Sequence, residues 1–127
     1  MRKLFTLISA LLLLAGCAAA DTKATYRQIH MDEAITLMET ESGYCILDVR
    51  TAEEFQAAHI PGAINIPNET IGTGEIPELP DKEQLILVYC RSGNRSKQAS
   101  KKLAELGYTN IAEFGGIQNW PGEVVSE

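Results

Sequence analysis

The residues best suited to chemistry stand together in the segment LVYCRSGNRSKQAS, residues 87–100. An apolar run ends at Cys90, a short loop with Arg91, Gly93 and Arg95 follows, and a helical pattern then begins. In open parallel α/β sheets, sites form where a strand ends and the next helix starts. Inward N–H groups, the helix dipole and two permanent guanidinium charges all favour a thiolate over a thiol. The segment therefore predicts an activated cysteine nucleophile in a small anion-binding loop.

The loop after Cys90 is expected to hold the substrate with its backbone as well as its side chains. Its glycine permits unusual backbone angles, and its last serine is expected to cap the following helix. The candidate substrate-binding residues are Arg91, Ser92, Gly93, Asn94, Arg95 and Ser96.

The first twenty residues have the layout of an export signal. Arg2 and Lys3 precede an apolar run that is too short to span a bilayer, and LAGC at 14–17 places Cys17 after small residues. This arrangement resembles the bacterial lipoprotein signal, in which the cysteine is lipidated; ordinary cleavage near AAA at 18–20 is the alternative. We expect a lipoprotein signal peptide at 1–16, a tether at 17–24 and one domain at 25–127.

The charge of the exported chain limits its partners. Without Arg2 and Lys3, eleven basic residues fall to nine against seventeen acidic ones, a net charge of −8. Such a surface repels nucleic acid and anionic membranes, so a membrane anchor would be the lipid itself. In a Gram-negative source the domain would face the periplasm. Ala18 favours the outer membrane, because in enteric bacteria an Asp at this place retains lipoproteins in the inner membrane.

Cysteine usage singles out Cys90. Cys17 is assigned to lipid, and Cys45 lies in the apolar run YCILDV, where a buried inert thiol is expected. Cys90 is then unpaired in a compartment that oxidises thiols, which is a liability unless the thiol is used.

Strand and helix patterns alternate along the domain, which predicts a parallel sheet with helices on both faces. Strand patterns occupy residues 25–29, 45–49, 63–66, 84–89 and 110–114. Helical patterns occupy 31–42 before Gly43, a short segment capped by Thr51 and Glu54, 96–106 before Gly107, and a turn stopped by Pro121. In the helix at 96–106, Ala99, Leu103 and Leu106 are expected to face the core and Lys97, Lys101, Lys102 and Glu105 to face away. Residues 67–80, rich in Gly and Pro, indicate a surface connection with one helical turn.

Three motifs in the right order resemble the single-domain rhodaneses of the rhodanese-like sulfurtransferase family. ILDVRTAEEFQAAHIPGAINIP at 46–67 is similar to the family's first signature, YCRSGNRS at 89–96 to its active loop, and the GG and Trp of 115–120 to its closing segment. The resemblance covers essentially the whole mature domain. It implies a three-layer α/β/α fold with a five-stranded parallel sheet in the order 1-5-4-2-3, in which strand 84–89 is central.

The resemblance also implies a mechanism. Cys90 would take the outer sulfur of a small anionic donor such as thiosulfate and hold it as a persulfide. A thiol or cyanide would then accept the sulfur, and a protein that hands over or receives sulfur is a further candidate partner. The N–H groups of residues 91–96 would stabilise the persulfide, and neither a metal nor an organic cofactor is implied. Arg91 and Arg95 match positions that vary in the family, so their anion-binding role rests on charge alone, and a solvated arginine is the alternative.

Three further motif residues are interpreted as structural support. Asp48 and Arg50, at the end of a strand, are expected to pair with loop backbone or with each other. His59 lies in a turn motif that the family uses for architecture, and thiol activation here needs no general base.

The length and residues of the loop bear on three rival functions. Cysteine phosphatases and arsenate reductases, which share the fold, need Cys-x5-Arg, whereas Arg95 follows Cys90 after four residues, so the loop would crowd a phosphoryl group. A tethered binding module is a second rival, although such domains often lack the cysteine. A membrane-tethered persulfide carrier needs the same Cys90 chemistry and stays open as an alternative to the enzyme.

Overall fold

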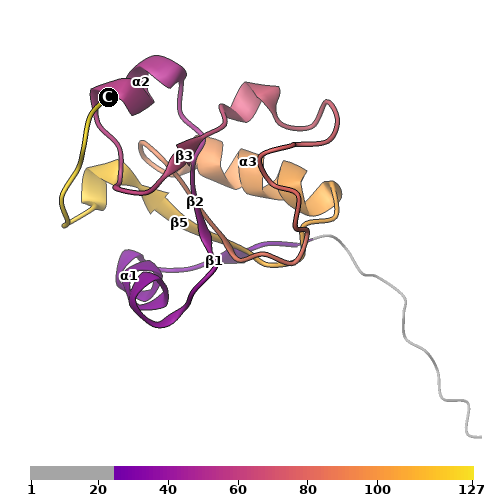
Figure 1. Ribbon diagram of the computed structural model, residues 1–127, viewed down its shortest axis with the longest axis horizontal. Helices are drawn as coiled ribbons and strands as arrows, with labels where there is room; N and C mark the ends of the chain where they lie inside the picture. The colour runs from indigo at the N-terminus through magenta and orange to yellow at the C-terminus, as the bar shows by residue number, and fades with distance from the viewer. Residues whose placement is uncertain (1–24) are drawn as a thin grey trace, which may run out of the picture.

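The computed structural model describes residues 25–127, which form a five-stranded parallel sheet covered by helices (Figure 1). From edge to edge the strands are β1 (Arg27–Gln28), β5 (Ile111–Gly116), β4 (Ile86–Cys90), β2 (Cys45–Asp48) and β3 (Ile64–Asn65). The predicted α/β class, the strand order 1-5-4-2-3 and the central place of strand 84–89 are confirmed. The signal peptide predicted at 1–16, the tether at 17–24 and the lipidation of Cys17 lie outside the described residues.

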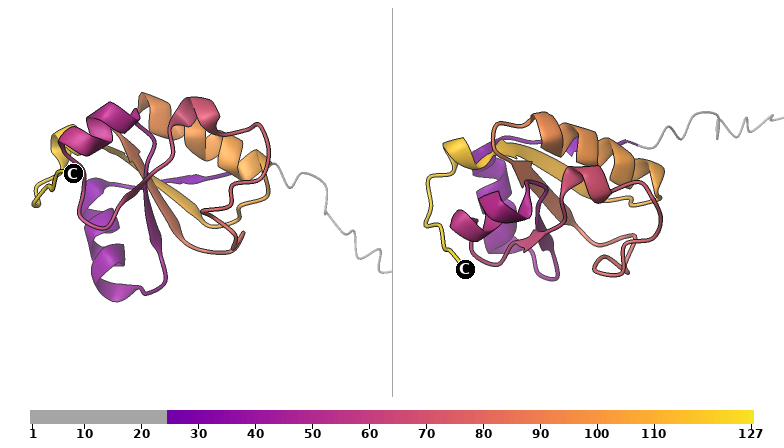
Figure 2. Two further views of the ribbon diagram at one scale, coloured as in Figure 1. Left: turned by 45° about the horizontal axis from the view of Figure 1, so that its top comes forward. Right: turned by 90° about the horizontal axis from the view of Figure 1, so that it is seen from above.

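Five helical segments connect and cover the strands. They are α1 (Met31–Thr40), α2 (Ala52–Ala57), η1 (Asn68–Thr70), α3 (Asn94–Glu105) and η2 (Ile117–Asn119). Figure 2 shows α1 on one face of the sheet and α3 with η1 on the other. Within residues 25–127, no helix has the length and apolar character needed to cross a membrane.

The central strand β4 divides the core into two layers, because successive residues of a strand point to opposite faces. Ile86, Val88 and Cys90 pack in the layer that includes α3. Leu87 and Tyr89 pack in the layer that includes α1. Because all of β4 is buried, the strand is a rigid mount for the residue at its carboxyl end.

The start of α3 differs from the prediction. The helix begins at Asn94, two residues before the expected Ser96, and its N-cap is Gly93 with no side-chain cap hydrogen bond. Gly93 has φ 114°, a left-handed conformation that glycine adopts without strain and that turns the chain into the helix early. Ser96 therefore lies inside the first turn, and its hydroxyl points back to the loop instead of capping the helix.

The ends of the helices follow local sequence signals closely. Thr51 and Glu54 form the predicted capping box at the start of α2. The end of α3 is also as predicted, since the N–H of Gly107 donates to Ala104 O. Helix α1 ends earlier than predicted, with Glu41 as its C-cap, so Gly43 lies beyond the cap.

The segment at 67–80 is more than the surface connection that its composition suggests. It contains the expected helical turn, η1, but Ile71, Ile76 and Leu79 are buried in the α3 layer of the core. Lys102, predicted to face away, instead donates from Nζ to the backbone oxygen of Asn68 at 2.9 Å. The prediction was wrong here because periodicity cannot detect isolated core residues in an irregular segment.

Candidate active site

Cys90 lies where the central strand meets the loop that leads into α3. It is 1% exposed and is the last residue of β4. The backbone N–H of Gly93 donates to Sγ at 3.0 Å, and the thiol donates to Ser96 Oγ at 3.4 Å. The first turn of α3 follows directly, so its positive dipole end lies beside the sulfur.

The pKa of Cys90 is lower than its ordinary value, as the sequence predicts. Burial raises the pKa, because it disfavours the charged form. The Ser96 hydroxyl and the backbone N–H groups of Ser96, Gly93 and Ser92 lower it and together outweigh burial. The loop therefore favours the thiolate by hydrogen bonding.

The loop rests on the end of β5. The N–H of Gln118 donates to the backbone oxygen of Arg91 at 3.3 Å. Gly116 lies so close to the loop that a Cβ there would collide with the backbone of Arg91 and Ser92. The predicted closing segment therefore fixes the position of the loop, and it needs glycine at this contact.

The candidate substrate-binding residues take different places. Gly93 and Ser96 meet at the Cys90 sulfur, and Ser92 contributes its backbone N–H. Arg91 and Asn94 are exposed. Arg91 lines a surface cavity of about 380 Å³ that also includes Arg50, Glu54 and Gln118.

Arg95 is bound to another side chain. Its guanidinium donates to Glu54 Oε1 at 2.6 Å and to Oε2 at 3.0 Å, with both side chains about a third exposed. The hydrogen bond from Arg95 lowers the pKa of Glu54 to about 2, and the same bond raises the pKa of Arg95. The charge of Arg95 is therefore largely offset by Glu54, a partner that the sequence analysis did not identify.

The residues predicted to be structural support lie at the end of β2 and around the turn after α2. Asp48 and Arg50 form a buried ion pair at 2.7 Å, one of the two pairings expected from the sequence. His59 Nδ1 is hydrogen-bonded to the Phe55 backbone oxygen at 2.8 Å, and its ring stacks on the Phe55 ring. Arg50 also donates to the Ala58 oxygen, so these contacts hold the turn that follows α2.

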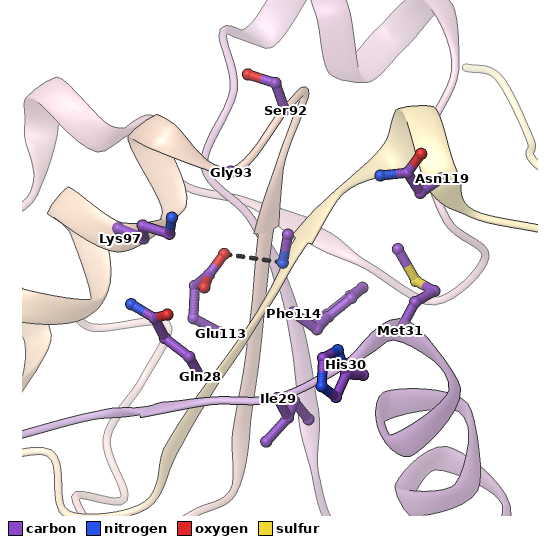
Figure 3. Close-up of a pocket in the computed structure, with 11 residues that line it drawn as sticks. Gln28, Ile29, His30, Met31, Ser92, Gly93, Lys97, Glu113, Phe114 and Asn119 are labelled. Carbon is purple, nitrogen blue, oxygen red and sulfur yellow. Dashed lines mark hydrogen bonds between the residues drawn. The ribbon is translucent and has the colours of Figure 1, made fainter.

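Glu113 is a buried residue at the site that the sequence analysis missed. It is 2% exposed, and its Oε1 accepts hydrogen bonds from Ser96 Oγ at 2.7 Å and from the Gly115 N–H at 2.8 Å. Glu113 lines a cavity of about 550 Å³. Figure 3 shows its side chain beside those of Lys97 and Gln28. A single acidic residue in the apolar run NIAEF was the signal that could have identified it.

The described residues contain neither a candidate metal site nor a disulfide. Among residues 25–127, no group of three or more His, Cys, Asp or Glu side chains is arranged to hold a metal ion. The cysteines of this part of the chain, Cys45 and Cys90, form no disulfide.

Comparisons with known proteins agree with this geometry. The family model of the Rhodanese-like domain matches residues 30–123, and that of the prokaryotic membrane lipoprotein lipid attachment site matches residues 1–18. Thiosulfate sulfurtransferase PspE of Escherichia coli (strain K12) is 40% identical over 73 residues, which are 58% of this chain and 70% of that protein.

Two other similar proteins show how far the likeness extends. A solved structure of a rhodanese with anions from E. coli has a TM-score of 0.61 and 36% identity, and the match covers 66% of this chain and 99% of that one. The adenylyltransferase and sulfurtransferase UBA4 of Meyerozyma guilliermondii is 38% identical over 91 residues, 65% of this chain. The chain spans only 21% of the length of UBA4.

Proposed function

This chain belongs to the rhodanese-like domain family and is a sulfurtransferase of the rhodanese type, and on that premise we propose that it transfers sulfane sulfur through a persulfide on Cys90. The donor is a small sulfur compound such as thiosulfate, and the acceptor is a thiol or cyanide. The observation that carries the proposal is the environment of the Cys90 sulfur. The sulfur accepts a hydrogen bond from the Gly93 N–H at 3.0 Å, and the pKa of the thiol is lowered.

The proposed reaction has two steps. The Cys90 thiolate attacks the outer sulfur of thiosulfate, the S–S bond of the donor breaks, and sulfite leaves with the bonding electron pair. The N–H groups of the loop, including that of Gly93, stabilise the terminal sulfur anion of the persulfide. Cyanide or a thiolate then attacks that terminal sulfur, the sulfur–sulfur bond to Cys90 breaks, and the Cys90 thiolate is regenerated. Neither step needs a metal or an organic cofactor.

A persulfide carrier that loads from a partner protein is the second candidate, and one observation favours it. Glu54 offsets the charge of Arg95, so the site offers a small dianion less attraction than the two loop arginines suggest. A larger donor, held by surface contacts, would depend less on that charge. The phosphatase alternative loses further support, because Arg95 is bound to Glu54 as well as being one residue too close to Cys90.

The location of the protein follows from its N-terminus. The lipid attachment site matched at residues 1–18 indicates an exported, lipid-anchored protein. We propose that Cys17 carries the lipid and that the domain faces the periplasm, with the outer membrane favoured by Ala18. Labelling of cells with a fatty-acid probe tests this, and unchanged labelling in Cys17→Ser would contradict it.

Intact-mass measurement of the purified protein after exposure to thiosulfate tests the proposed chemistry. We expect one added sulfur, mapped to Cys90, and its loss after cyanide is added. Cys45→Ser is the matched control and should still gain the sulfur. Repeated turnover with thiosulfate identifies an enzyme, whereas loading only from a protein donor identifies a carrier. A protein that gains no sulfur from either source would overturn the persulfide proposal.

A further inference from the structure

Glu113 is a buried acid next to the site, and the proposed sulfur transfer does not use it. Its neighbours on β5 show where its side chain points: Ile111 packs in the core layer of α3, whereas Ala112 and Phe114 pack in the opposite layer. Because strand residues alternate, the Glu113 carboxylate lies on the α3 face, which is also the face of Cys90. A buried carboxylate is costly unless it is hydrogen-bonded, so its partners indicate its role.

The surroundings of Glu113 contain few charged groups. The ion pairs among residues 25–127 are Asp48–Arg50 and Glu54–Arg95, so no basic side chain of this part of the chain pairs with Glu113. Lys97 from α3 and His30, which precedes α1, line the same cavity as Glu113 (Figure 3). Cys90 from β4 is the remaining titratable group, and it is linked to Glu113 through Ser96.

The Ser96 hydroxyl connects Glu113 to Cys90. It has a single proton to donate, and several hydrogen-bond acceptors lie around it. Ser96 Oγ lies 2.7 Å from Glu113 Oε1, 2.9 Å from the Gly93 oxygen and 3.4 Å from the Cys90 sulfur. Hydrogen bonds to an ionised acceptor are the shorter and stronger ones. Ser96 therefore donates to Glu113 and accepts from the Cys90 thiol, an arrangement that suits the protonated sulfur.

We propose that Glu113 is a positioning residue that restrains the ionisation of Cys90 through the Ser96 hydroxyl. When the thiol loses its proton to solvent, Ser96 must turn its own proton from the carboxylate to the sulfur. Ionisation also places a second negative charge in the same buried cluster. The hydrogen bonds of the loop, including that of the Gly93 N–H, favour the thiolate, and Glu113 adds to the burial that opposes it.

Such a restraint has a chemical use in the proposed function, on which this inference rests. The nucleophilicity of a thiolate falls as its pKa falls, and the most effective attacking thiol has a pKa near the ambient pH. A loop that only stabilised the thiolate would produce an abundant but weak nucleophile. Glu113 keeps the thiolate of Cys90 more basic and hence more reactive toward sulfur.

The test is the pH dependence of Cys90 alkylation by iodoacetamide in the purified full-length protein, read at the Cys90 peptide by mass spectrometry. Glu113→Gln keeps the size and the acceptor oxygen but removes the charge, so the midpoint should fall by about one pH unit. Ser96→Ala supplies the second background. If the effect passes through Ser96, Glu113→Gln should lower the midpoint there by less than half as much.

Controls separate the possible failures. Glu105→Gln, which removes an exposed charge elsewhere on α3, should leave the midpoint unchanged. An unshifted or raised midpoint in Glu113→Gln overturns the proposal, and a raised one would identify Glu113 as a base for the thiol. Equal shifts in the two backgrounds also overturn it, because the charge would then act without Ser96. If Glu113→Gln does not fold, Glu113→Asp, which withdraws the carboxylate from Ser96, must lower the midpoint instead. Loading of Cys90 with sulfur is measured separately, so failure of the proposed function is distinguishable.

Discussion

Cys45 and Cys90 lie at opposite ends of adjacent parallel strands, and their pKa values are shifted in opposite directions. Cys45 is the first residue of β2 and pairs with Ile86, the first residue of β4, whereas Cys90 is the last residue of β4. With strand residues about 3.3 Å apart, the two thiols are separated along the sheet by roughly 13 Å. This separation is too large for a disulfide without backbone movement.

Burial alone does not explain the difference between the two thiols. It raises the pKa of Cys45 to about 11, although Cys45 is only partly buried. Cys90 is only 1% exposed, yet hydrogen bonds from Ser96 and from the loop backbone outweigh burial and lower its pKa. The carboxyl end of a parallel strand supplies these donors and the amino end does not. Reactivity in this fold therefore depends on which end of the strand holds the thiol.

Removal of the Cys90 thiol should have the largest effect. Cys90→Ser should abolish sulfur transfer, because a hydroxyl in the same loop is not ionised near neutral pH and cannot carry a sulfane sulfur. The fold should persist, since serine is close in size to cysteine. Thiosulfate:cyanide transfer rates and circular dichroism measure the two outcomes, and wild-type turnover in this variant would eliminate Cys90 as the nucleophile.

Displacement of the loop should have the next largest effect, because it removes the donors while keeping the thiol. In Gly116→Ala, the new Cβ collides with the backbone of Arg91 and Ser92, so the loop that donates to the sulfur must shift. We expect transfer to fall by about tenfold or more, as small displacements at a reacting centre often cost more than that.

The acidity of Cys90 in this variant should change with its activity. Its alkylation midpoint should rise toward that of a free thiol, while that of Cys45 stays near its wild-type value. In Gly122→Ala, the new Cβ would be crowded by the Trp120 side chain instead of by the loop backbone, so this matched glycine control should not shift either midpoint. A normal Cys90 midpoint in Gly116→Ala would mean that the loop donors do not set the acidity.

Disruption of the ion pair between Arg95 and Glu54 should have a smaller effect on sulfur transfer, since the pair is partly exposed and solvent screens it. Arg95→Ala should weaken the use of thiosulfate by a few-fold and raise the Cys90 midpoint slightly. Glu54→Gln should act in the opposite direction, because it releases the positive charge of Arg95. Values of KM for thiosulfate and for a neutral organic trisulfide donor separate charge from structure. Equal losses with both donors in Arg95→Ala would show that Arg95 acts on the structure of α3.

The folded-state pKa of Glu54 also predicts how stability changes with pH. Folding lowers this pKa to about 2, so the pair with Arg95 stabilises the fold above the ordinary carboxyl pKa. That stabilisation is lost as the pH falls through the ordinary range toward 2. In denaturant titrations, the free energy of unfolding of Glu54→Gln should differ less between neutral and acid pH than that of the wild type.

The sequence predicted those features that a short motif, or the order of strands and helices along the chain, indicates. The alternation of apolar strands and amphipathic helices determines the fold class, and the capping box at Thr51 is visible within four residues. The early start of α3 was missed because it depends on the positive φ of Gly93. The pairing of Glu54 with Arg95 joins residues 41 apart in sequence, so no local pattern indicates it. Glu113 left a trace as an acid in an apolar strand, but its link to Cys90 required the fold.

The smallest effect on catalysis is expected at Cys45, and it completes the comparison of the two thiols. Cys45→Ser should leave sulfur transfer largely unchanged, because the hydrogen bonds of Cys90 go to Ser96 and Gly93 and not to the amino end of β2. The new hydroxyl could cost about 1–3 kcal/mol of stability if it finds no partner in the core. Folding raises the pKa of Cys45 to about 11, so the neutral thiol stabilises the wild type below its unfolded pKa, and that contribution is lost as the pH rises toward 11. Denaturant titrations between neutral pH and pH 11 should therefore show that the free energy of unfolding falls more steeply with pH in the wild type than in Cys45→Ser. A large fall in turnover in Cys45→Ser would mean that the two ends of the sheet are coupled.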